Sequence, residues 1–304
     1  MNILQGTVIG AGAILLIFLP SFVSPYWITL LFTFLINIAL AGGINLLWGY
    51  SGYMNLGYMS FFGLGAYGTT LFIFNGYPFP VGLLFNLILL LPAAGFLSLL
   101  LFRLQGLYFS AATLGVLILL EEMAGKLAFL SGGLEGLSLP LGDHALEGYL
   151  FSLGLAGVSL GANFLINKKR LGFQLRMIRE DERTAQSIGI PVLTSKIKAY
   201  VLGASIALLA GGIYIHQTRY IGPSSSFGLS VAMPPVIMAL IGGGKKWWGP
   251  LLGALFITGL QEILWTGLNH WVLSGYGIVI ILLGIFWRGF DSWDRAFSRS
   301  STPG

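Results

Sequence analysis

Three glutamates lie in or beside long apolar stretches, where a carboxylate could bind an ion or carry a proton. Glu121 and Glu122 lie toward the end of one stretch, and Glu262 lies within another. Ionisable side chains inside a membrane are costly and are therefore commonly functional. However, Lys126 follows Glu122 by four residues, which is the spacing of an ion pair on a helix surface. We favour charged groups at the membrane surface, with an ion or proton site as the alternative.

Other patterns that could support chemistry are incomplete. The GGGKK stretch lacks two features of a phosphate-binding loop, because Ala239 stands where the first glycine is needed and Lys246 where Ser or Thr is needed. The histidines His144, His216 and His270 show no metal-ligand spacing along the chain. The chain has no cysteine, which excludes thiol chemistry. The sequence therefore predicts no catalytic residue, no metal site and no cofactor bound by this chain.

The composition is that of an integral membrane protein. Hydrophobic residues make up 56% of the chain and charged residues only 9%, against about 25% charged in a typical soluble domain. No Asp, Glu, Lys or Arg occurs in residues 1–102. A transmembrane helix needs roughly 20 apolar residues, so several spans must lie there. The net charge of +5 does not indicate nucleic-acid binding, since the basic residues lie between the apolar stretches.

The apolar pattern predicts a single transmembrane domain over residues 1–304, all-α and polytopic, with about ten helices. The first apolar run lacks a signal-cleavage pattern and is expected to be retained. With both termini in the cytoplasm, every Lys and Arg except Lys126 and Arg219 falls on the cytoplasmic side, as the positive-inside rule requires. The expected spans are 6–23, 27–48, 58–76, 80–102, 106–128, 146–165, 198–217, 228–244, 249–267 and 271–288, with an outer loop at 129–145, a cytoplasmic loop at 166–197 and a cytoplasmic tail at 289–304.

The segment 168–198 is the main polar stretch between spans and holds eight of the 16 basic residues. Read as a helix, it places apolar residues at steps of three and four on one face and arginines elsewhere. The apolar positions are Leu171, Leu175, Ile178, Ala185 and Ile188, and the arginines are Arg176, Arg179 and Arg183. This pattern predicts an amphipathic helix at the membrane surface.

The same helix carries spacings that support its exposed face and its end. Arg176 and Glu180 lie four residues apart and Arg179 and Glu182 three apart, as in helical ion pairs. Gly189 can adopt the left-handed conformation that ends a helix, and a proline follows two residues later. These features fit two interpretations equally well. The segment is either a solvated connector that fixes topology or a helix that docks into a soluble partner.

A glycine-rich stretch, GYSGYMNLGYMSFFGLGAYG, joins two spans from Gly49 to Gly68. Its glycines favour close helix packing, which is how helices associate in lipid. Asn55, flanked by Tyr53 and Tyr58, also fits a broken segment that lines a path through the membrane. Asn45 on the preceding span is expected to face protein rather than lipid. We take Asn45, Tyr53, Asn55 and Tyr58 as candidates for a translocation path.

Five motifs in order carry a resemblance to a known family. The chain resembles the M-type (LivM-like) permease subunits of branched-chain amino acid ABC importers, within the wider superfamily of amino acid, sugar and urea permeases. The resemblance covers most of the chain, from about Gly49 to Trp287. The motifs are GYSGYMNLGYMSFFGLGAY, RLQGLYFSAATLG at 103–115, SGGLEGLSLP at 131–140, RLGFQLRMIREDERTAQSIGI at 170–190 and GPLLGAL at 249–255.

The resemblance implies that the 170–190 segment is the coupling helix received by a cytoplasmic ATPase subunit. The positions that match the family there are Arg176, Arg179, Glu182, Ala185 and Gly189. It further implies a second related permease subunit, two cytoplasmic ABC ATPase subunits that use ATP and Mg²⁺, and an extracytoplasmic substrate-binding protein. The chain itself would be a transport subunit and not an enzyme.

The resemblance also implies a prokaryotic plasma (inner) membrane and an amino acid substrate, with branched-chain amino acids favoured over urea, amides or sugars. The chain departs from the family pattern at Lys245 and Lys246, where small or hydroxyl residues are usual, and at Tyr58, where His or Gln is common. These departures leave the substrate open. A transporter of another class, driven by an ion gradient and dependent on Glu121, Glu122 or Glu262, is the rival interpretation.

Overall fold

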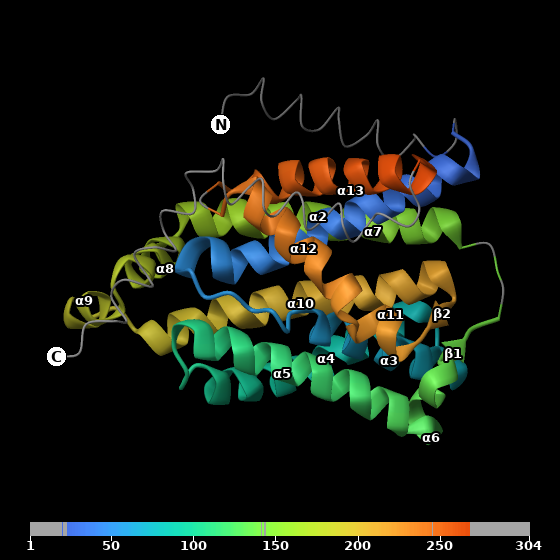
Figure 1. Cartoon of the computed structure of the whole chain (residues 1–304), viewed down its shortest axis with the longest axis horizontal. Helices are drawn as coiled ribbons and strands as arrows, with labels where there is room; N and C mark the ends of the chain where they lie inside the picture. The colour runs from blue at the N-terminus through green and yellow to red at the C-terminus, as the bar shows by residue number, and fades with distance from the viewer. Residues whose placement is uncertain (1–19, 21–22, 141, 143, 245, 268–304) are drawn as a thin grey trace.

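The computed structural model describes residues 20, 23–140, 142, 144–244 and 246–267, which form a bundle of helices (Figure 1). Six helical segments are long and apolar enough to cross a membrane, so the chain is a polytopic all-α membrane protein. They are α2 (Pro25–Ser51), α4 (Phe79–Leu101), α5 (Gly106–Lys126), α7 (Ala145–Lys168), α10 (Val192–Thr218) and the pair α11 (Pro223–Phe227) and α12 (Leu229–Gly242). The other elements are α3 (Met59–Phe74), α6 (Ala128–Ser131), η2 (Gly133–Glu135), β1 (Leu137–Ser138), α8 (Arg170–Glu180), α9 (Glu182–Ser187), β2 (Tyr220–Ile221) and α13 (Gly249–Gly267).

Eight of the ten predicted spans coincide with apolar helices in the described part of the chain. The largest difference is at α10, which begins at Val192, directly after its N-cap residue Pro191, and not near residue 198. Lys196 is buried within its first turns. The predicted spans 6–23 and 271–288 and the predicted tail 289–304 lie outside the described residues. The total of ten helices and the side on which each terminus lies therefore stay predictions.

Helices α2 and α10 form the interior of the bundle. Most of their side chains are buried, with α2 packed against α7 and α10 packed against α3. Helices α4 and α5 lie at the periphery and expose apolar side chains, among them Ile88 and Tyr108. Such apolar surface is stable against lipid or a neighbouring subunit, so it fits a membrane protein.

Helices α3 and α10 approach each other through glycines. A Cβ at Gly65 would collide with the carbonyl oxygen of Leu208, and a Cβ at Gly211 would collide with the carbonyl oxygen of Phe62. The two backbones are therefore in direct contact at two points. This close approach supports the packing interpretation of the glycine-rich stretch, since small residues let helices associate closely in lipid.

Different elements gather at the two ends of the bundle (Figure 1). Helices α8 and α9 lie at one end, whereas α6 and the short strands lie at the other. The strands pair antiparallel, with Leu137 opposite Ile221 and Ser138 opposite Tyr220. The α7–α10 connection thus lies at one end of the molecule, and the α5–α7 connection lies at the other.

Candidate functional site

The polar segment between α7 and α10 forms two helices that meet at Asp181, where one continuous helix was predicted. Asp181 is extended, with φ −159°, and its carboxylate accepts a hydrogen bond of 2.6 Å from the backbone N–H of Thr184. It therefore caps the start of α9. Leu175, Ile178 and Ala185 are buried as predicted. Ile188 was predicted on the same face but is 58% exposed, because α9 ends before it.

Arg179 ties α8 to the end of α2. Its Nη1 donates a hydrogen bond of 2.7 Å to the carbonyl oxygen of Gly49. Burial lowers the pKa of Arg179, and the nearby carboxylate of Glu180 opposes that change. The side-chain stem passes close to Gly52, which has φ 79° and ends α2. The contact with α2 replaces the predicted pairing with Glu182.

Glu182 pairs instead with Lys196 of α10. Lys196 Nζ lies 2.8 Å from Glu182 Oε1 and donates a hydrogen bond of 3.2 Å to the hydroxyl of Tyr53. The Tyr53 hydroxyl in turn donates to Glu182 Oε2 at 2.5 Å. Burial, followed by the bond to Glu182, raises the pKa of Tyr53. These three side chains join α9, α10 and the loop after α2.

Aromatic rings enclose the ammonium group of this cluster. Lys196 Nζ lies 4.2 Å from the ring centroid of Tyr53 and 5.4 Å from that of Phe102, distances at which a cation is attracted to a ring face. The Lys196 side chain is only 2% exposed. Sequence reasoning missed Lys196 because it was counted as one of many loop charges. Its place in the first turns of a long apolar helix was the available signal.

Arg176 ties α8 to the end of α7. Its guanidinium donates to the side-chain oxygen of Asn167 at 3.0 Å and to the carbonyl oxygen of the same residue at 3.4 Å. Arg176 makes these bonds and not the predicted ion pair with Glu180. Gly189 has φ 82°, the left-handed conformation expected at the end of the segment. Together, Arg176, Arg179 and Glu182 fix the α8–α9 segment to α7, α2 and α10.

The four predicted path residues are not brought together. Asn45 donates a hydrogen bond of 2.8 Å to Asn163 of α7, and both are buried. The Tyr58 hydroxyl donates to the carbonyl oxygen of Gly203 at 3.2 Å. Asn55 is also buried, whereas Tyr53 belongs to the lysine cluster described above. These contacts join helices, and a role in the path stays a prediction.

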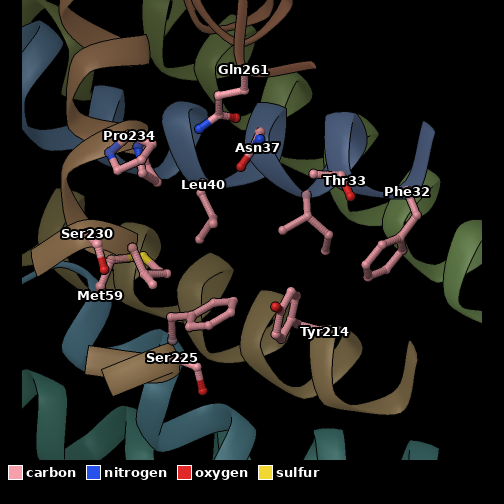
Figure 2. A pocket seen from close by; sticks show the side chains of 14 residues that line it. Phe32, Thr33, Asn37, Leu40, Met59, Tyr214, Ser225, Ser230, Pro234 and Gln261 are labelled. Carbon is pink, nitrogen blue, oxygen red and sulfur yellow. The ribbon is translucent and has the colours of Figure 1, made fainter. Parts of the chain in front are cut away.

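A cavity of about 270 Å³ opens between α2, α3, α10 and the α11–α13 region (Figure 2). None of the four predicted path residues lines it. Its walls are mostly apolar, and they carry hydroxyl and amide groups from several helices. The lining residues are Phe32, Thr33, Ile36, Asn37, Leu40, Met59, Phe62, Tyr214, Ser225, Ser230, Val231, Pro234, Pro235 and Gln261.

The α12 helix at this wall lacks two backbone hydrogen-bond donors. Pro234 and Pro235 lie inside this helix and have no N–H group. The carbonyl groups of Ser230 and Val231, one turn earlier, therefore lack their usual helical donors. All four residues line the cavity. Backbone acceptors in a largely apolar cavity suit a ligand that combines a small apolar part with a hydrogen-bond donor or cation.

Two of the three glutamates considered above have partners. Glu122 Oε2 lies 3.4 Å from Lys126 Nζ, and both side chains are well exposed, as expected for a pair at a membrane surface. Glu262 of α13 accepts a hydrogen bond from the hydroxyl of Tyr26 at the start of α2. The structure thus places Glu122 in the predicted i, i+4 pair.

Comparisons with known proteins agree with this architecture. The chain is 27% identical over 161 residues to the inner membrane ABC transporter permease protein YjfF of Escherichia coli, covering 50% of this chain and 47% of the relative. It is 26% identical over 156 residues to the high-affinity branched-chain amino acid transport system permease protein LivM of Escherichia coli. That match covers 50% of this chain and 35% of the relative. A probable branched-chain amino acid transport permease protein LivH of Methanocaldococcus jannaschii is 23% identical over 125 residues, covering 41% and 38%.

These matches span less than half the length of each curated relative. No solved structure matches the chain significantly. The family model described as "Branched-chain amino acid transport system / permease component" matches residues 26–284, which include all the helices described from α3 to α13 and nearly all of α2. The chain therefore belongs to this family of ABC transporter permeases.

Proposed function

We propose that this chain is the membrane-spanning subunit of an ATP-driven importer that carries branched-chain amino acids across a prokaryotic plasma membrane. The observation that carries the proposal is the α8–α9 segment, a basic surface element fixed to α2, α7 and α10 by Arg176, Arg179 and Glu182. A force applied to this segment would reach three helices of the bundle at once. Membership in the permease family supplies the expected source of that force.

The α8–α9 segment has an inner and an outer face with different roles. Arg179 and Glu182 face the bundle and position the segment. Phe173 is 53% exposed and Ile188 is 58% exposed, and Arg183 is exposed between them in sequence. We assign contact with a cytoplasmic ATPase subunit to this outer set. Closure of the ATPase pair would then move α8–α9 and switch the bundle between inward-open and outward-open arrangements.

The cavity beside α12 is the proposed place for the substrate. Phe32, Ile36 and Leu40 provide an apolar wall suited to a branched side chain. The carbonyl groups of Ser230 and Val231 would accept hydrogen bonds from an amino acid ammonium group. A cavity of about 270 Å³ lies just below the usual range of about 300–1,000 Å³ for ligand pockets, which suits a single small amino acid.

The importer would need further subunits. The proposed assembly contains a second related permease, two cytoplasmic ABC ATPase subunits that use ATP and Mg²⁺, and an extracytoplasmic substrate-binding protein. In this arrangement the present chain binds no cofactor and performs no chemistry. Permeases for urea, amides or sugars in the wider superfamily are the alternative substrate classes.

Reconstitution of the complete assembly in liposomes tests the proposal. ATP-dependent uptake of labelled leucine is expected, and Ile188→Asp should reduce both uptake and recovery of the ATPase subunits by about tenfold, since a charge would enter an apolar contact. Leu134→Asp is the matched control for ATPase recovery, because Leu134 is 85% exposed at the opposite end of the bundle. Uptake by this chain alone, driven by an ion gradient, would contradict the ATP-driven function. Normal ATPase recovery with Ile188→Asp would contradict the proposed contact.

A further inference from the structure

His144, Glu147 and His216 meet where α7 begins and α10 ends. Glu147 Oε2 lies 3.2 Å from His144 Nδ1 and 2.9 Å from His216 Nε2. One ligand atom from each of the three residues lies within 4.8 Å of the other two. Two imidazoles and a carboxylate are a preferred ligand set for Zn²⁺ and similar divalent transition metals.

The spacing of these atoms is close to that of a metal site. Ligand atoms about 2.1 Å from a tetrahedral Zn²⁺ lie roughly 3.4 Å from one another. The separations of 2.9 and 3.2 Å around Glu147 differ little from this value. Small side-chain rotations would bring the three ligands onto one ion. A fourth position would stay open to water, as in zinc sites with three protein ligands.

The cluster combines a fixed ligand with an open approach. His216 is buried, and its ring stacks on that of Phe79 with 3.8 Å between centroids and 14° between planes. This stacking holds the imidazole in place. The side chain of Glu147 is 61% exposed and that of His144 is 33% exposed, so an ion can enter from the surface. Preformed geometry and an entry path are two requirements of a metal site.

The end of α10 also contains unsatisfied polar groups. Among the described residues, His216 Nδ1, Gln217 Oε1 and Arg219 Nε are buried without a hydrogen-bond partner. Buried polar atoms without partners are rare in folded proteins, and where they gather a small polar ligand is favourable. Arg219 adds a positive charge that opposes a cation, so the carboxylate of Glu147 is needed to balance the charge of the ion.

We propose that His144, Glu147 and His216 bind a divalent transition-metal ion of the Zn²⁺ type. The ion would link the first turn of α7 to the last turn of α10, at the end of the bundle that carries β1 and β2 (Figure 1). The ligands come from two helices, and His216 follows Glu147 by 69 positions, which is why the full ligand set is not visible as a spacing along the chain. The proposal does not depend on the transport function.

Calorimetric titration of the purified full-length chain with ZnCl₂ tests this site. One Zn²⁺ per chain is expected, together with a higher thermal unfolding midpoint, because an ion that binds the folded state stabilises it. Glu147→Gln and His216→Gln should each weaken binding at least about tenfold.

A matched control keeps the test specific. Glu135→Gln removes another carboxylate, in η2 just before β1, and should not change Zn²⁺ affinity. If His216→Gln does not fold, Glu147→Gln decides the question, since its side chain is largely exposed. Failure of wild-type chain to bind Zn²⁺ saturably overturns the proposal. So does undiminished binding by Glu147→Gln.

Discussion

Lys196 Nζ lies 2.8 Å from Glu182 Oε1, so a buried ammonium group joins the start of α10 to α9. The two side chains differ in exposure, at 2% for Lys196 and 28% for Glu182. The lysine thus depends on its carboxylate partner much more than a surface lysine would. This asymmetry makes the pair a sensitive point of attachment between the α8–α9 segment and the bundle.

Lys196→Met should lower the free energy of unfolding by about 3 kcal/mol, because it leaves the partly buried Glu182 without its cation. The double variant Lys196→Met with Glu182→Gln should lose less of its free energy of unfolding, since no unpaired charge remains. Chemical unfolding of the purified chain measures both values. Lys198→Met is the control, because Lys198 is exposed two residues later in the same helix. Equal decreases in the free energy of unfolding for Lys196→Met and Lys198→Met would show that the Lys196–Glu182 pair does not stabilise the fold.

Arg179→Ala should reduce ATP-driven transport by about tenfold while leaving ATPase binding nearly unchanged. The reason is that Arg179 holds α8 to Gly49 of α2, whereas the exposed side chains of the segment are free to contact the ATPase. Transport rates and ATPase recovery in reconstituted liposomes separate the two effects. Arg183→Ala, which removes an exposed arginine nearby, should instead lower ATPase recovery, and transport should fall with it. Loss of ATPase binding with Arg179→Ala would place this residue at the partner surface instead.

Asn163→Leu should lower the free energy of unfolding by about 2 kcal/mol or more. Asn163 accepts a bond from Asn45 and donates to the carbonyl oxygens of Gly42 and Ser159, all in the buried contact between α2 and α7. Thermal unfolding in detergent gives the change. Asn75→Leu is a suitable comparison, since Asn75 bonds only locally at an exposed helix end among the described contacts. A similar small change for both variants would refute the structural role of the asparagine pair.

Pro235→Ala should weaken substrate binding at least about fivefold without lowering stability. Alanine supplies the N–H that proline lacks, so the carbonyl group of Val231 would be satisfied within α12 and no longer available in the cavity. Substrate-dependent uptake at several concentrations gives the apparent affinity. Pro92→Ala, inside α4 and away from the cavity, should restore a helical bond without affecting affinity. Unaltered affinity with Pro235→Ala would remove the α12 backbone from substrate binding.

Sequence patterns were sufficient to predict the helices, but they did not predict the contacts between them. Apolar runs located α4 and α5 to within a few residues, because hydrocarbon thickness dictates the length of a span. The buried face of the α8–α9 segment was predicted correctly at Leu175 and Ala185. Local spacing could not show that Asp181 would end α8, since its capping bond to Thr184 competes with a continuous helix.

The partners of the charged side chains depended on distant parts of the chain. Spacing suggested that Glu182 would pair with Arg179, yet Lys196 is its partner because the turn after α9 brings α10 alongside. The cluster of His144, Glu147 and His216 was equally invisible, since His216 lies at the end of α10 and the other two residues lie at the start of α7. Periodicity reports which face of a helix is buried, but it does not report which neighbour that face meets.

The contacts of Gly65 with Leu208 and of Gly211 with Phe62 leave no side-chain layer between α3 and α10. Sliding one of these helices along the other would drive backbone into backbone, so the two must travel as a single stiff unit. Any rearrangement that opens a passage has to pivot elsewhere. Gly228, where the short α11 gives way to the proline-containing α12, offers such a pivot between Ser225 and Ser230, which both line the cavity.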